Sequence, residues 1–347
     1  MSVRSMRRWG AGVLVVALGP ALVVAAPASA SSPGGSRIVW TNTPTLDEVG
    51  STGSLVLARP DGSGQRALTP QTAGVNDINA AISPEGGQVL FERDTATSAG
   101  LRLVPIGGGD SVAIPLGCAT ACEGDVDPTW LSDERIAFTR YLDSDVYPAG
   151  YAGILYTASN DGSHVRRLSP SGSDGLYEDQ FARRSADRTY LTFIRVRIDD
   201  GAGAVFRMAP DGSDIRQLTP WDLQAYAYDL SPARSGPTKD LVVFQTYGEG
   251  NPDGSSRDLA TVPATCTSLA ACTAQIRYVT HNGAGLGRAS NPSWSPDGRR
   301  IAFAGRPSAD DVDCQIETIR SDGTDRRTVS TSPAFDYRPD WGPADRS

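Results

Sequence analysis

The sequence predicts an all-β fold, a six-bladed β-propeller of four-stranded antiparallel blades, because one unit of roughly fifty residues recurs along the chain after residue 30. Alternating apolar residues, as in Arg300–Ala304 and Asp240–Gln245, indicate packed strands, and no helical period is sustained after residue 31. Complementary half-repeats at the two ends indicate a closed ring. A β-sandwich is the alternative fold, but it does not explain these half-repeats.

The most regular part of the unit is a hairpin with Asp-Gly at its turn. Aspartate and glycine tolerate the positive φ angles of a tight turn, and strand-like residues flank the pair on both sides. The four clear copies have their glycines at positions 62, 162, 212 and 323. The spacings leave room for two degenerate copies, which we place at Leu101–Pro115 and Leu259–Thr280.

A strand–turn–strand unit precedes the hairpins. It is clearest at Asn291–Phe303, and weaker copies occur at Asn79–Phe91, Asp127–Phe138, Phe181–Phe193 and Ala227–Phe244. Arg37–Trp40 has the second strand alone and Arg338–Pro343 the first alone. We expect these halves to form one blade, so that the last strand closes the ring and removes an exposed sheet edge. Residues 31–347 are thus expected to form one domain.

These repeats resemble a known family. Trp294–Phe303, followed by Arg320–Arg327, is similar to the WD-type propeller repeat of TolB-like proteins, and the resemblance covers essentially all of residues 31–347. TolB-like propellers serve as periplasmic protein-binding scaffolds, and the same repeat forms a non-catalytic gate domain in prolyl-oligopeptidase-like enzymes. We expect this chain to lack the extra N-terminal domain of TolB and any hydrolase domain, so the resemblance implies neither role in full.

Residues 1–30 are predicted to be a cleaved signal peptide. Arg4, Arg7 and Arg8 precede an apolar run at Ala11–Ala26, and Ala28–Ala30 supplies a small-residue cleavage pattern. A membrane anchor is the alternative, but the apolar run is shorter than the roughly twenty residues that span a bilayer. The mature protein is therefore expected to be extracytoplasmic, in the cell envelope or outside the cell, and to have no membrane span.

The mature chain is acidic. The signal holds three of the 32 basic residues and no acidic residue, so residues 31–347 have 29 basic and 40 acidic residues and a net charge of −11. Nucleic-acid binding relies on a basic surface, so a nucleic-acid partner is excluded. We expect a monomer.

Five cysteines lie at positions 118, 122, 266, 272 and 314. In an exported protein this spacing favours two local disulfides, Cys118–Cys122 and Cys266–Cys272, with Cys314 left as a buried thiol in a strand. Zinc binding is the alternative, but it requires more clustered ligands, and the sequence has only two histidines.

No catalytic set is recognised. His164 lies in a hairpin turn and His281 beside a glycine-rich stretch, so neither fits a nucleophile–base pair. Oxygen-rich segments at Asp143–Asp145, Asn251–Gly254 and Asp310–Asp313 resemble calcium loops, but none completes an EF-hand pattern.

One repeated acid is a candidate site. Five residues before the aromatic that aligns with Trp294, four repeats carry aspartate, namely Asp77, Asp125, Asp179 and Asp336, while the other two carry Ala225 and Ala289. The inner strands of a propeller surround a channel, so these positions are expected to form a ring at one mouth. The ring is predicted to hold a ligand or a divalent cation such as calcium, together with neighbouring Asp127, Glu178, Asn291 and Arg338. The alternative is that each aspartate caps its own turn or forms hydrogen bonds to a neighbouring blade.

The sequence favours a non-enzymatic binding module that recognises a protein, peptide, glycan or small ligand at a propeller face or channel mouth. The alternative is a metal-dependent propeller hydrolase or lyase whose cation is held by the aspartate ring.

Overall fold

A computed structural model describes residues 35–45, 52–118, 122–142, 152–170, 175–247, 257–283, 287–306 and 313–345. The predicted signal peptide lies outside the described residues, as do Asp143–Asp145, Asn251–Gly254 and most of Asp310–Asp313. In the described part of the chain, no helix is long and apolar enough to cross a bilayer.

The described residues form an all-β structure of antiparallel sheets. Four of the sheets have four strands each: β24 (Phe335–Gly342), β1 (Arg37–Thr43), β2 (Ser54–Ala58) and β3 (Arg66–Ala67); β12 (Tyr177–Arg184), β13 (Leu191–Arg197), β14 (Gly203–Met208) and β15 (Arg216–Gln217); β16 (Tyr228–Leu230), β17 (Leu241–Gln245), β18 (Leu259–Pro263) and β19 (Arg277–Tyr278); β20 (Arg288–Trp294), β21 (Arg300–Arg306), β22 (Gln315–Arg320) and β23 (Arg327–Thr328).

The remaining strands belong to one eight-stranded sheet. It contains β4 (Asn76–Ile82), β5 (Gln88–Thr95), β6 (Ser98–Pro105), β7 (Val112–Ala113), β8 (Cys122–Ser132), β9 (Arg135–Leu142), β10 (Ala152–Ser159) and β11 (Arg166–Arg167). Its two halves, β4–β7 and β8–β11, are joined where Ala99 of β6 pairs in parallel with Gly124 of β8. Because this pairing merges two repeats into one sheet, the count of six blades stays a prediction.

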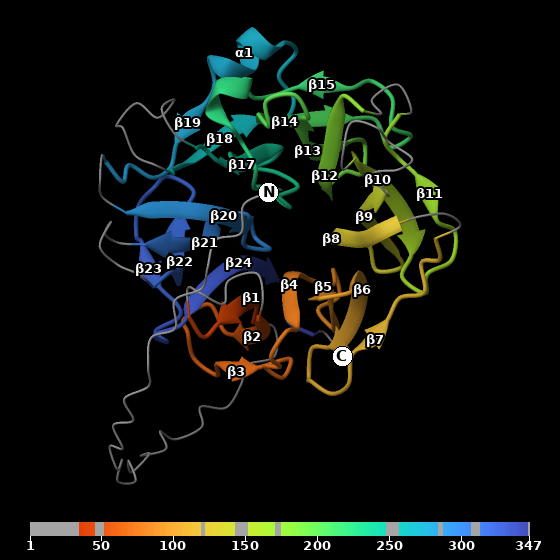
Figure 1. The fold of residues 1–347 in the computed structure, drawn as a ribbon. Coiled ribbons are helices and arrows are strands. Elements are labelled where there is room, and N and C mark those ends of the chain that lie inside the picture. The colour runs from red at the N-terminus through yellow and green to blue at the C-terminus, as the bar shows by residue number, and fades with distance from the viewer. Residues whose placement is uncertain are drawn as a thin grey trace, which may run out of the picture. The chain divides into compact units, whose positions relative to one another are not determined.

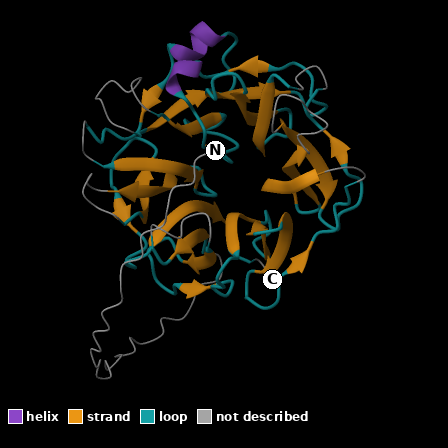
Figure 2. Ribbon diagram, in the orientation of Figure 1, coloured by secondary structure: helices purple, strands orange, loops and turns teal. Residues whose placement is uncertain are grey.

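The sheets are arranged as in a β-propeller. Figure 1 shows β4, β8, β12, β20 and β24 nearest the common axis, and the short strands β3, β7, β11, β15, β19 and β23 at the periphery. Strands account for most of the regular structure in Figure 2, beside the short helices η3 (Trp221–Leu223) and α1 (Leu269–Thr273). The strand nearest the axis in each sheet is the first strand of the strand–turn–strand unit.

Strands from the two ends of the repeat region pair with each other. β24 runs antiparallel to β1, with Asp336 opposite Asn42 and Trp341 opposite Ile38. The two half-repeats therefore share one four-stranded sheet, as the sequence predicts. Closure of the whole ring stays a prediction.

The Asp-Gly hairpins turn as the sequence predicts. In all four clear copies the aspartate carboxylate accepts the backbone N–H of the residue two positions later, and the glycine has a φ between 81° and 88°. Each turn also touches a neighbouring repeat. A Cβ at Gly212, for example, would lie 2.3 Å from the carbonyl oxygen of Leu168. Glycine is therefore required both by the backbone angle and by the close approach of another strand.

A large aromatic side chain marks the second strand of each strand–turn–strand unit. These residues are Trp40, Phe91, Phe138, Phe193, Phe244 and Phe303, and all are fully buried. They pack against aliphatic residues of their own and adjacent sheets. Burial of an aromatic side chain of this size is the largest apolar contribution that one position in the repeat can make.

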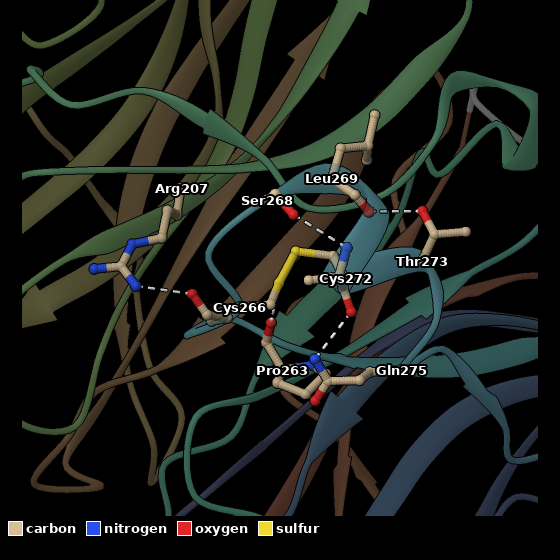
Figure 3. The surroundings of a disulfide bond; sticks show 10 residues. Arg207, Pro263, Cys266, Ser268, Leu269, Cys272, Thr273 and Gln275 are labelled. Carbon is tan, nitrogen blue, oxygen red and sulfur yellow. Dashed lines mark hydrogen bonds between the residues drawn. A yellow bond between two sulfur atoms is a disulfide. The ribbon is translucent and has the colours of Figure 1, made fainter.

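Both predicted cysteine pairs lie at disulfide distance. The Cα–Cα distances are 6.1 Å for Cys118–Cys122 and 5.3 Å for Cys266–Cys272. The second bridge closes the insert that carries α1 (Figure 3). The first turn of α1 is capped by the Ser268 hydroxyl, which accepts the Ala271 N–H. Cys314 is a free, buried thiol.

Candidate functional site

The predicted aspartates Asp77, Asp125 and Asp179 each face an arginine across their own strand pair. Asp77 lies opposite Arg93, Asp125 opposite Arg140, and Asp179 opposite Arg195. Each arginine donates two hydrogen bonds to its carboxylate, with N–O distances from 2.6 to 2.9 Å. Paired charges of this kind offset the cost of burying a carboxylate.

The paired arginines also lie against the aromatic residues of the core. The guanidinium of Arg195 lies 5.3 Å from the ring centroids of both Phe193 and Phe206 and 4.8 Å from that of Tyr177. Arg93 and Arg140 lie 5.5 Å from the rings of Phe91 and Phe138 in the same way. Three repeats therefore share one arrangement of carboxylate, guanidinium and aromatic ring, which favours a structural role for these aspartates.

Asp336 has neutral partners instead. Its carboxylate accepts hydrogen bonds from the side chains of Asn42, at 2.7 Å, and Ser332, at 3.2 Å. Burial raises the pKa of Asp336 above its ordinary value, and these hydrogen bonds act against the shift. Within the described ranges, no group of three or more histidine, cysteine, aspartate or glutamate side chains could hold a metal ion. A ligand or cation role for the four aspartates stays a prediction.

A second ring of equivalent positions lies two residues after the aspartates. Asn79, Asp127, Phe181, Asn291 and Arg338 all have a positive φ, between 51° and 55°. All five sit at a β-bulge of the innermost strand, where the register with the next strand shifts. The left-handed conformation is uncommon for such side chains. The same irregularity thus recurs around the axis.

These bulge residues line a cavity of about 630 Å³. Ala227, the equivalent residue of the sixth repeat, lines it too. Five of the six also line a smaller cavity of about 60 Å³, formed with Pro128, Arg183 and Asp340 among others. Residues at these positions therefore line both a wide cavity and a narrow one. None of the four predicted aspartates is among the residues that line either cavity.

One wall of the wide cavity is acidic. The Asn79 amide donates to Glu92 Oε2 and Asp127 Oδ1, both at 2.8 Å, and the Asp127 N–H donates to Glu92 Oε2 at 2.9 Å. Arg338 Nη1 donates to Asn79 Oδ1 at 2.5 Å. Burial raises the pKa of Asp127 to about 6, and burial followed by the Asp127 charge raises that of Glu92. Burial and Glu92 raise the pKa of nearby Asp94 to about 7.

The cavity also has an arginine-rich wall. Arg257, Arg288 and Arg306 line it together with Tyr247. The Arg257 guanidinium lies 4.7 Å from the Tyr247 ring centroid and donates to the Tyr247 hydroxyl at 3.2 Å. Burial, followed by the charges of Arg306 and Arg257, lowers the pKa of Arg288. The three guanidinium groups therefore act on one another, away from the bulge network of Asn79.

A buried ionic group includes Arg183 and Asp340, which line the narrow cavity. Arg183 Nε donates to Asp229 Oδ1 at 3.2 Å, and Asp229 Oδ2 accepts the Trp294 N–H at 2.7 Å. Asp340 Oδ2 accepts the Ile82 N–H at 2.8 Å, and burial raises the pKa of Asp340 to about 7. The first two contacts link the sheets of β12, β16 and β20, and the third links the sheet of β24 to that of β4.

The structure brings only part of the predicted site together. Asp127, Asn291 and Arg338 line the wide cavity, and Glu178 lies beside it, accepting from the Gln180 amide at 3.3 Å. Sequence reasoning missed Asn79, Glu92 and the three arginines. Asn79 could have been found from the repeat alignment, because it lies two residues after Asp77, at the position that Asp127, Asn291 and Arg338 occupy in other repeats. The arginines occupy non-equivalent repeat positions, so no periodic signal marked them.

Comparisons with known proteins support the fold. No protein-family model and no curated protein sequence match the chain. Among solved structures, TolB from Acinetobacter baumannii is similar at a TM-score of 0.65 and 15% identity, covering 88% of this chain and 66% of that one. A putative TolB from Agrobacterium tumefaciens gives a TM-score of 0.58 and 16% identity, covering 90% and 99%.

A third similar structure is hydrazine synthase from Kuenenia stuttgartiensis, with a TM-score of 0.66 and 12% identity, covering 90% of this chain and 47% of that one. The chain spans less than two thirds of the length of this protein and of the Acinetobacter TolB. At these identities the likeness concerns the fold alone, which is a TolB-like β-propeller.

Proposed function

We propose that this protein is an exported binding module that recognises a ligand in the wide cavity at the mouth of its propeller channel. The observation that carries the proposal is the cavity itself, which is lined by the equivalent bulge position of every repeat. Its volume of about 630 Å³ lies in the range of ligand-binding cavities. A protein or glycan would insert a loop or a terminal sugar, and a peptide or small ligand would enter whole.

The proposal includes six blades closed into a ring. The eight-stranded sheet divides into β4–β7 and β8–β11, each with the strand order of the separate four-stranded sheets. Pairing of β24 with β1 supports closure. A closed ring holds the five bulge residues and the equivalent Ala227 at fixed positions around the axis. Binding sites benefit from such rigidity because ordering a flexible site costs affinity.

Export is supported by the signal-like first thirty residues and by the two disulfides, which persist in oxidising compartments. N-terminal sequencing of protein from the culture medium or envelope should begin at or near Ser31. Mature protein that retains Met1, or that is found in the cytoplasm, would contradict the proposal.

Binding without catalysis is supported by the composition of the cavity wall. Among the described residues that line it, none is a histidine, and the candidate nucleophile Cys314 has its pKa raised to about 12 by burial. A thiol in that state is a poor nucleophile at neutral pH.

The metal-dependent hydrolase or lyase remains the alternative, with its cation on Asp77, Asp125, Asp179 and Asp336. Metal analysis of the purified protein tests it. A stoichiometric cation, lost together with an activity when a chelator is added, would support the enzyme over the binding module.

Ligand capture tests the proposal directly. Mature protein is applied to peptide and glycan arrays beside the variant Ala227→Phe, which places a ring in the cavity without altering any charge. Ala274→Phe, at an exposed position beside α1, is the matched control. We expect Ala227→Phe to lose ligands that the parent and the control retain. Equal binding by all three proteins would place ligand recognition elsewhere.

A further inference from the structure

Two arginines face each other across one strand pair at the cavity. Arg288 is the first residue of β20 and lies opposite Arg306, the last residue of β21. Like charges directly opposite in an antiparallel pair are destabilising. The stability of the sheet alone therefore gives no reason for this pair.

The same register position carries different residues in the other repeats. Its counterparts are Asn76 opposite Asp94, Gly124 opposite Tyr141, Glu178 opposite Val196, and Phe335 opposite Thr43. In the next register position, where three repeats place an aspartate opposite an arginine, this sheet has Ala289 opposite Gly305. The repeat with two arginines thus lacks the aspartate that its neighbours have one residue later.

An acidic residue of the same sheet, Glu317, pairs with a different arginine. Glu317 of β22 packs beside Gly305 and forms an ion pair with Arg326, whose guanidinium lies 5.2 Å from the Phe303 ring centroid. This reproduces the arrangement of carboxylate, guanidinium and aromatic ring with residues from other positions of the repeat. Among the described residues, Arg288 forms no ion pair.

A third arginine joins this pair from the adjacent sheet. The Ala289 N–H donates to the Arg257 carbonyl at 3.2 Å, which sets Arg257 beside the start of β20. The Arg257 side chain is held on Tyr247, and all three arginines line the wide cavity. Tyr247 is 38% exposed, so this wall is open to solvent and to a ligand.

We propose that Arg257, Arg288 and Arg306 bind an oxyanionic group of the ligand, a carboxylate or a sulfate-like group. Guanidinium groups pair with planar oxyanions through two parallel hydrogen bonds, and three of them in a half-buried cavity attract an anion strongly. A bound oxyanion also relieves the repulsion between Arg288 and Arg306. The acidic wall of Glu92 and Asp127 repels an anion, so the ligand is oriented with its anionic end toward β20 and β21.

The inference rests on the proposed function in taking the cavity as the ligand site, but it is tested with simple ions. Citrate and inorganic sulfate are titrated into the mature protein at low ionic strength and followed by calorimetry and by NMR of the arginine Nε–H groups. The test variant is Arg288→Gln/Arg306→Gln. The matched control is Arg234→Gln/Arg299→Gln, which removes the same charge from two exposed arginines near the opposite turn of β20 and β21.

We expect saturable binding of at least one ion to the parent, because each guanidinium contributes charge-assisted hydrogen bonds. Affinity should fall about tenfold or more in Arg288→Gln/Arg306→Gln and change less than about twofold in the control. Stronger binding of citrate would indicate a carboxylate ligand, and stronger binding of sulfate a sulfated or phosphorylated one. A cooperative unfolding transition verifies that the test variant folds.

Absence of saturable binding to the parent, or equal affinity in both double variants, would overturn the inference. These outcomes are separate from the array experiment. In one outcome, Ala227→Phe abolishes capture of an array ligand while the affinity for citrate and sulfate does not depend on Arg288 and Arg306. In that case the cavity binds ligands without an oxyanion subsite. If the ions depend on the arginines but no array ligand depends on Ala227, the oxyanion site exists and the proposed function fails.

Discussion

Replacing Asp179 by asparagine should destabilise the protein strongly. The Asp179 carboxylate is 2% exposed and its partner Arg195 8% exposed, so neither group can recover water when the other is lost. Asparagine keeps the shape but removes the negative charge that faces the Arg195 guanidinium among its aromatic rings. Removing one partner of a buried ion pair costs about 3–5 kcal/mol, so Asp179→Asn should lower the free energy of unfolding by about that amount.

The loss is measured by urea unfolding of the parent and of Asp179→Asn, followed by intrinsic fluorescence, as a fall in midpoint at unchanged slope. Asp200→Asn is the control, because Asp200 pairs with Arg197 in the same manner but at the surface, with side chains 46% and 32% exposed. A surface pair contributes about 0–1 kcal/mol. The double variant Asp179→Asn/Arg195→Gln should lose less than the sum of its single changes, because it leaves no buried charge without a partner.

Two results would refute this reasoning. One is a loss for Asp179→Asn within about 1 kcal/mol of that for Asp200→Asn, since burial would then be irrelevant to the pair. The other is unchanged stability with weakened ligand or cation binding. That second result would assign the aspartates to a binding site, as the sequence first suggested.

Three further changes test other parts of the structure. Between about pH 4 and pH 7 folded Asp340 keeps a proton that the unfolded chain releases, so the free energy of unfolding should fall as pH rises through this window. Asp340→Asn should show a smaller fall in urea unfolding across that range, and an identical profile would argue against the raised pKa. Cys266→Ser/Cys272→Ser should lower stability by about 2 kcal/mol, because the bridge closes a short loop of the unfolded chain, and reducing agent should then have no further effect at this bridge. Deleting Phe335–Ser347 removes β24 and exposes the edge of β1, so the truncated protein should unfold or aggregate; a soluble product with a cooperative transition would argue for an open array.

Much of the fold could be predicted because it follows from local residue patterns. Asp-Gly turns and buried aromatics at Phe91 or Phe303 reflect short-range backbone chemistry or the two-residue period of a strand. The pairing of the half-repeats follows from their complementary places in the repeat. The cysteine pairs followed from their short separations. Regular repetition made each of these signals visible several times.

The partners of the aspartates were also encoded, although the sequence reasoning did not find them. Arg93 and Arg195 each follow their aspartate by 16 residues and Arg140 follows Asp125 by 15, a spacing set by the turn and the cross-strand register. The aspartates were instead aligned with one another around the axis. Repulsion among them was the basis for a binding site, but a neutralising arginine beside each of three removes that repulsion.

By itself, the sequence determined the repeat, its strands and turns, the aromatic core and the disulfides, because each depends on residues close together in the chain or on positions equivalent between repeats. Only the tertiary structure decided which side chains share the cavity. Arg257, Arg288 and Arg306 come from two sheets and from non-equivalent positions, and Glu92 meets Asp127 across two repeats. Such contacts depend on how the sheets are set around the axis and on side chains at non-equivalent positions of the repeats, and neither leaves a period in the sequence.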